Sequence, residues 1–199
     1  TEFSIKLLFR HFLLSFFYIS CANSPQKQDP LPAHDEFTIE SKIVEETRNI
    51  NFWTPPEYKS SPDSLPVMYM ADGGIIDEDF PHIANTIAAL IKSKNIPPMI
   101  LVGIANTQRR RDLSGPTEVD SDKEIAPAVG GSEKFRAFIK EELFPEINKR
   151  YRTTSEKSII GESLSGLFVV ETFFLSPDMF DHYIAFDPSL WWNNHYLVR

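Results

Sequence analysis

The sequence predicts an α/β fold, a mostly parallel sheet with helices on both faces. Short β-rich runs alternate with amphipathic segments from residue 37 onward, and the last four runs are almost continuously apolar, as in strands covered on both faces. Strand–helix alternation implies parallel pairing through right-handed crossovers. We expect the first two runs to form an antiparallel pair at the entry to the sheet, and the last part of the sheet to be missing from this chain.

The individual elements follow from local patterns. Runs bounded mostly by Pro, Gly, Asp or Asn predict strands at Phe37–Lys42, Arg48–Trp53, Val67–Met70, Met99–Ile104, Lys157–Ile160 and Tyr183–Phe186. Apolar residues at helical spacing predict helices at Pro81–Ser93, Ser132–Tyr151 and Leu164–Ser176. We expect Ser132 to be an N-cap and Pro145 to kink or end its helix.

The N-terminal residues resemble an export signal. Lys6 and Arg10 precede an apolar run from Phe12 to Ile19, which is too short to cross a membrane. The following Ser20-Cys21 resembles a loose lipobox, so residues 1–21 are expected to be a signal that ends at a lipidated cysteine, and residues 22–35 a flexible tether. The protein would then be an exported lipoprotein of the periplasm or outer membrane. The alternative is a buried free cysteine in an N-terminal helix.

Composition limits the remaining classes of function. The chain of 199 residues is long enough for one domain, expected at residues 36–199. A formal net charge of −8 argues against a nucleic-acid partner, because phosphate binding needs a clustered basic surface. No motif for a metal or a nucleotide occurs, so neither a metal nor another cofactor is expected. The oligomeric state is left open.

The segment from Ser158 to Val170 has the layout of a nucleophile elbow. A short apolar strand leads into Gly161-Glu162-Ser163-Leu164-Ser165-Gly166 and then into an apolar helix. Small residues on both sides of Ser163 allow a sharp turn that exposes the hydroxyl at the edge of the sheet. Ser163 is therefore the predicted nucleophile for attack on an acyl carbon, although Ser165 stands where a strict G-x-S-x-G pattern has glycine.

Acyl transfer also needs donors for the oxygen that becomes negative. The backbone N–H of Leu164, directly after the serine, is one predicted donor. The loop after the third strand contains Asp72-Gly73-Gly74, and Gly74 is the predicted second donor. The alternative is that these three residues form only a turn.

A serine nucleophile also needs an acid and a base. Both should follow the serine in the chain. Only two histidines do so: His182, at the entry to a strand, and His195, near the chain end, and both are expected to be ordinary surface or packing residues. Asp187, after the sixth strand, is either a triad acid or a cap for the next turn. Catalysis would then need a histidine outside this chain.

Three further side chains are candidates for substrate binding. Arg111 belongs to a run of three arginines after the fourth strand, one of which is expected to bind an anionic group of the substrate. Trp191 and Trp192 follow the sixth strand and either wall a substrate pocket or belong to the core.

Together these residues resemble the Putative esterase family of α/β-hydrolases, in the branch that includes siderophore (enterobactin-type) esterases. The resemblance rests on the elbow and on matches in the same order at residues 68–74, 102–107, 111–113, 130–135 and 180–192. It implies an α/β-hydrolase fold, Ser163 as nucleophile, and the amides of Gly74 and Leu164 as oxyanion hole. Glu162 and Ser165 depart from the common histidine and glycine, and the region that carries the family's catalytic histidine has no counterpart here.

The leading hypothesis is an exported serine esterase that forms an acyl-enzyme on Ser163 and hydrolyses small esters, of siderophore or other type. A lipid-anchored binding protein that keeps only the scaffold is the first alternative, since a fold alone does not prove activity. Acyl transfer to an alcohol, as in the related mycolyl transferases, is the second.

Overall fold

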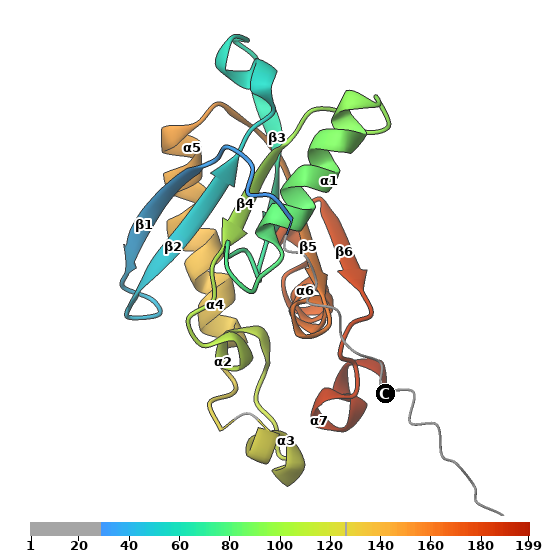
Figure 1. Ribbon diagram of the computed structural model, residues 1–199. Coiled ribbons are helices and arrows are strands. Elements are labelled where there is room, and N and C mark those ends of the chain that lie inside the picture. Colours follow the sequence, from blue (N-terminus) through green and yellow to red (C-terminus); the bar gives the residue numbers. More distant parts are fainter. Residues whose placement is uncertain (1–28, 126) are drawn as a thin grey trace, which may run out of the picture.

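The computed structural model describes residues 29–125 and 127–199 (Figure 1). The predicted export signal, Cys21 and the first part of the predicted tether lie outside the described residues. The remainder of the tether contacts a helix: Asp29 Oδ2 lies 2.5 Å from His82 Nδ1, and Asn85 donates to the Pro30 carbonyl at 2.8 Å.

One six-stranded sheet organises the molecule. Its strands are β1 (Asp35–Ser41), β2 (Glu46–Trp53), β3 (Leu65–Met70), β4 (Ile100–Ile104), β5 (Thr153–Glu162) and β6 (His182–Phe186). They lie in the order β1-β2-β4-β3-β5-β6. β1 and β2 pair antiparallel and β2 pairs antiparallel with β4, whereas β4, β3, β5 and β6 are parallel. The expected parallel sheet with an antiparallel entry is confirmed, and the carboxyl ends of four strands meet at one edge.

The longer helices cover both faces of this sheet, as Figure 1 shows for α1 in front and for α4 and α5 behind. They are α1 (Phe80–Lys92), α4 (Ser132–Phe138), α5 (Phe144–Arg150) and α6 (Leu164–Leu175), and the π-helical segment η2 (Ile139–Leu143) joins α4 to α5. The shorter helices are α2 (Arg109–Leu113), α3 (Asp120–Ile125), α7 (Trp192–His195), η1 (Pro56–Lys59), η3 (Pro177–Met179) and η4 (Tyr196–Val198).

The helix predicted at 132–151 differs in detail from the structure, and the N-cap prediction was wrong. The N-cap is Gly131, and Ser132 is already the first helical residue. Of the two outcomes expected at Pro145, a kink or an end, the end does not occur: the regular helix α4 gives way to the π-helical η2, and Pro145 lies in the first turn of α5 that follows. The fixed φ of a proline suits the first turn of an α-helix.

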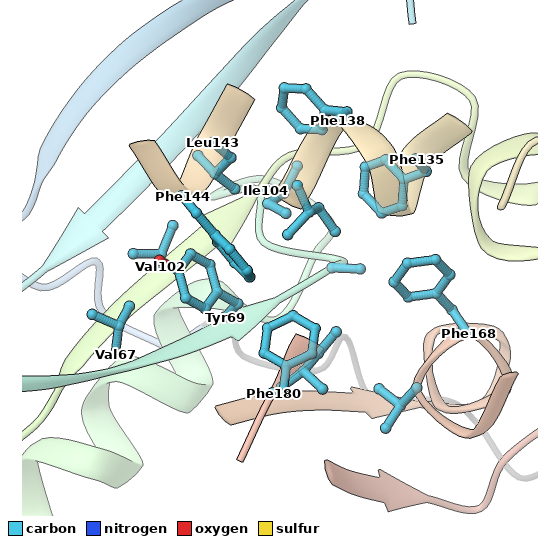
Figure 2. Packing of buried hydrophobic residues seen from close by; sticks show 14 of the residues in the cluster. Val67, Tyr69, Val102, Ile104, Phe135, Phe138, Leu143, Phe144, Phe168 and Phe180 are labelled. Carbon is cyan, nitrogen blue, oxygen red and sulfur yellow. The ribbon is translucent and has the colours of Figure 1, made fainter. Parts of the chain in front are cut away.

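Alternate residues of the central strands enter two separate cores. Val67 and Tyr69 of β3 pack with the residues of α4, η2, α5 and α6, whereas Met68 and Met70 pack with α1. Figure 2 shows the larger core, where Phe135, Phe138, Phe144, Phe168 and Phe180 gather around the β3 and β4 side chains. Burial on both faces explains why these strands are apolar throughout. Within the described ranges, no helix has the length and apolar character needed to cross a membrane.

Candidate active site

Ser163 lies on a sharp turn between β5 and α6. Its backbone has φ 55° and ψ −116°, a conformation that a residue with a side chain rarely adopts. Three main-chain hydrogen bonds hold it: its N–H donates to the Phe186 carbonyl at 3.1 Å, and its own carbonyl accepts from Leu167 at 2.9 Å and Ser189 at 3.0 Å. The residue is exposed while its successors are buried. The turn therefore holds the Ser163 hydroxyl at the solvent-facing edge of the sheet.

Small residues beside Ser163 let the helix approach the strand. A Cβ on Gly161 would lie only 2.5 Å from the carbonyl carbon and oxygen of Ser165. Ser165 is compatible with the elbow because its hydroxyl turns back to the strand end. It accepts from the Glu162 N–H and donates to the Glu162 carbonyl, both at 2.9 Å. The serine in place of the usual glycine thus ties the first turn of α6 to β5.

Leu164 is the first residue of α6 and is 7% exposed. An N–H in the first turn of a helix has no intrahelical acceptor and lies at the positive end of the helix dipole. The Leu164 amide is thus placed beside the nucleophile, as an oxyanion donor requires. Its role remains a prediction.

The loop after β3 contains the second predicted donor, Gly74. The Gly74 N–H donates to Glu78 Oε2 at 2.7 Å, and the Asn106 N–H donates to both oxygens of the same carboxylate at 3.2 and 3.3 Å. Burial raises the pKa of Glu78, and the two amides oppose that rise. In this conformation the Gly74 N–H is therefore bonded to a carboxylate, and its role as an oxyanion donor stays a prediction. Sequence reasoning did not single out Glu78. The available signal was an acidic residue four positions after Gly74, close enough to contact the same loop.

Asp72 organises the polar side of the same loop. It is buried, has φ 55°, and accepts from Arg109 Nε at 2.6 Å, from Arg109 Nη2 at 2.8 Å and from Asn106 Nδ2 at 2.6 Å. A cavity of about 390 Å³ opens over these groups. Its lining residues are Asp72, Ile76, Asp77, Glu78, Asp79, Asn106, Thr107 and Arg109. A larger cavity of about 580 Å³, lined by Trp53, Tyr58 and Leu65 among others, lies at the opposite edge of the sheet.

Arg111 is tied to the start of β2. It donates to Glu46 at 2.6 and 3.0 Å and to Asp112 at 2.7 Å. Asp112 also pairs with the buried Arg48 at 2.8 Å. The hydrogen bond from Arg111 lowers the pKa of Glu46 to about 2, with smaller contributions from Thr107 and Arg48. Substrate binding by Arg111 stays a prediction, and the contacts described here are with the protein itself.

The turn after β6 approaches the nucleophile. Asp187 is its first residue, exposed and with φ 39°, and its role as the acid stays a prediction. Ser189 is 6% exposed, and its Oγ lies 3.3 Å from Ser163 Oγ. Sequence reasoning did not single out Ser189, which follows the predicted sixth strand by three residues. The pairing of the β5 and β6 ends brings it to the site.

The two tryptophans have different surroundings. Trp191 is 48% exposed, whereas Trp192 is 2% exposed and donates from Nε1 to the Gly115 carbonyl at 3.1 Å. The two alternatives for these residues were the wall of a substrate pocket and the core, and Trp192 belongs to the core. Trp191 is open to solvent, and its contact with substrate remains a prediction.

Neither histidine that follows the serine contacts it. His182 lies at the amino end of β6, pairs with Glu156 at 3.1 Å and is exposed. His195 is the last residue of α7; it is exposed, and its backbone has a left-handed conformation. In residues 29–125 and 127–199, the side-chain partner of the Ser163 hydroxyl is Ser189 and not a histidine.

Comparison with known proteins assigns this chain to a family. The model of the family described as Putative esterase matches residues 41–197. The chain therefore belongs to the Putative esterase family. The predicted family resemblance and the α/β-hydrolase fold are confirmed.

Several known proteins are similar to this chain. The chain is 29% identical over 182 residues to the ferri-bacillibactin esterase BesA of Bacillus subtilis, covering 85% of this chain and 63% of the relative. It is 27% identical over 180 residues to a siderophore triacetylfusarinine C esterase of Aspergillus fumigatus, covering 83% and 59%. Among solved structures, an IroE-like serine hydrolase from Shewanella oneidensis superposes with a TM-score of 0.73 at 31% identity, covering 80% of this chain and 52% of that one. The chain thus spans about six-tenths of the length of the curated relatives it matches.

Proposed function

We propose that this protein is a serine carboxylic-ester hydrolase that forms an acyl-enzyme on Ser163. The observation that carries the proposal is the strained, exposed Ser163 at the strand–helix turn, with the first amide of α6 beside it. Membership of the Putative esterase family supports it.

The proposed reaction has two steps. Ser163 Oγ attacks the ester carbonyl while its proton passes to a histidine supplied by sequence outside this chain. The C–O bond to the leaving alcohol then breaks, and that alcohol takes the proton from the histidine. Water then attacks the acyl carbon while its proton passes to the same histidine. The bond from that carbon to Ser163 Oγ breaks, the carboxylic acid leaves, and the histidine returns the proton to Ser163 Oγ. Asp187 is the candidate acid that orients the histidine.

The carbonyl oxygen becomes negative in both steps and needs donors. The Leu164 amide supplies one. The Gly74 amide supplies the second once the Glu78 carboxylate, now 2.7 Å away, has moved aside or has been neutralised. Glu78 therefore competes with the oxyanion for the same N–H.

For the substrate, we propose small esters, with siderophore-type esters as the first class to test. The named activities of two relatives, a ferri-bacillibactin esterase and a siderophore triacetylfusarinine C esterase, support this choice. The exposed Trp191 and the polar cavity beside Arg109 offer an aromatic surface and a cation for such a molecule.

The decisive experiment compares Ser163→Ala with the unsubstituted protein, both expressed from the complete reading frame, on p-nitrophenyl esters. Turnover should fall by at least about 1,000-fold with an unchanged unfolding midpoint. Undiminished turnover would refute the proposal. Product analysis with and without an added alcohol separates hydrolysis from acyl transfer.

We also propose that the protein is exported and anchored by a lipid on Cys21. The basic and apolar N-terminal pattern that ends in Ser20-Cys21 supports this. Cys21→Ser should release the protein from the membrane fraction without changing the turnover of the soluble protein. Equal membrane retention in both forms would contradict the anchor.

A further inference from the structure

Ser189 is held against the nucleophile by the backbone and by a neighbouring anchor. Its N–H donates to the Ser163 carbonyl at 3.0 Å, and its carbonyl accepts from the Trp192 N–H at 3.1 Å. The Trp192 indole is fixed in turn by the Gly115 carbonyl. Ser189 therefore sits in a short, doubly fixed turn, and its position does not depend on its own hydroxyl.

The Ser189 hydroxyl touches the reacting atom. Its Oγ lies 3.3 Å from Ser163 Oγ, longer than the roughly 2.7–2.8 Å usual between two hydroxyl oxygens. One proton can lie between the two oxygens, from either residue. When a base removes the proton of Ser163, only Ser189 is left to donate. A hydrogen bond to an oxygen that gains negative charge is shorter and about twice as strong as one between neutral groups.

We propose that Ser189 is a further catalytic residue, whose O–H donates to Ser163 Oγ as that oxygen becomes negative during attack and again as the acyl-enzyme breaks down. The inference rests on the proposed function of Ser163. The contact is weak before the reaction and strong in the transition state. Loss of the hydroxyl should therefore lower kcat and leave KM unchanged.

If Ser189 had a purely structural role, loss of its hydroxyl would lower the stability of the protein. The catalytic role predicts the opposite pattern. Ser163 is exposed, so its hydroxyl can turn to water when Ser189 loses its own. The main-chain bonds of Ser189 remain in an alanine variant. Removal of the hydroxyl should therefore change activity but not stability.

The test uses Ser189→Ala and Ser189→Thr in the protein expressed from the complete reading frame. Ser132→Ala is the matched control, because Ser132 is a buried serine of α4 outside the site. We expect Ser189→Ala to lower kcat for a p-nitrophenyl ester and the rate of fluorophosphonate labelling by about 10- to 100-fold. KM and the urea unfolding midpoint should not change. Ser189→Thr, which keeps the hydroxyl, should recover most of the rate, and Ser132→Ala should match the unsubstituted protein.

The two levels of the proposal fail in distinguishable ways. If Ser163→Ala abolishes turnover but Ser189→Ala keeps kcat within about twofold, the nucleophile stands and the role of Ser189 is refuted. A loss in Ser189→Ala that appears as a raised KM or a lowered unfolding midpoint also refutes it. If Ser163→Ala keeps full turnover, the proposed function fails and this inference fails with it.

Discussion

Gly161→Ala is the most direct perturbation of the elbow. The added Cβ would lie 2.5 Å from the carbonyl carbon and oxygen of Ser165, whereas ordinary van der Waals contact begins at 3.4 Å. The atoms it meets are backbone, so a side-chain rotation cannot relieve the clash. The first turn of α6 must therefore move away from β5 by about 1 Å.

This displacement has two measurable costs. Overpacking of this kind usually lowers the free energy of unfolding by about 1–3 kcal/mol. A shift of about 1 Å in a reacting group can lower the rate about 100-fold, and here it moves Ser163 relative to its oxyanion donors. We expect both effects in Gly161→Ala, with the larger one in kcat.

The assay combines urea unfolding with steady-state kinetics on a p-nitrophenyl ester. Glu162→Ala is the matched control, because it places the same side chain at the next residue, where the native side chain is exposed. The control should keep its rate and its unfolding midpoint. A Gly161→Ala variant with unchanged kcat and midpoint would show that the strand and helix are not packed as described.

Three further predictions concern residues around the site. Glu46→Gln should lower the free energy of unfolding at pH 7 by about 1–2 kcal/mol, allowing for solvent at a carboxylate that is 24% exposed. Arg111 lowers the pKa of Glu46 from 4.5 to about 2, so the loss should shrink as the pH falls from 4.5 to 2 in urea titrations, and a loss independent of pH would contradict the ion pair. Glu78→Gln should raise kcat/KM at pH 8 by about 3- to 10-fold by weakening the competitor at Gly74. Because burial raises the pKa of Glu78, the carboxyl is already partly neutral at lower pH, so the gain should narrow toward pH 5, and a loss of activity at every pH would contradict the assignment of Gly74. Trp192→Ala should cost about 3–5 kcal/mol of unfolding free energy, whereas Trp191→Ala should raise KM with little effect on stability, and the reverse pattern would contradict their placement.

Most of the fold could be predicted from local patterns. The β3 and β4 strands are apolar at every position because both of their faces are buried, and that signal is local. The continuous helical run through Pro145 could not be predicted, because it depends on the π-helical segment just before the proline. The N-cap is Gly131, one residue before the predicted Ser132. Ser132 has helical backbone geometry and is already the first residue of α4.

The site could be predicted where one short segment builds it. Ser163 and Leu164 share a single turn, so the pattern around them predicts their placement. The hydroxyl contact with Ser189 arises because β5 and β6 are neighbours in register, with Glu162 opposite Phe186, and this pairing joins residues far apart in the sequence. The contact of Arg111 with Glu46 is likewise tertiary and has no local sequence signal. Gly74 and Glu78 are only four residues apart, so the acid is visible in the sequence, but its hydrogen bond to Gly74 depends on how the loop folds.

Reactivity of Ser163 is the central claim, and covalent labelling tests it most directly. The protein expressed from its complete reading frame would be treated with a fluorophosphonate probe, digested, and mapped by mass spectrometry. We predict one modified peptide containing Ser163 and no modification in Ser163→Ala. A label on another peptide, or equal labelling of the alanine variant, would contradict the account.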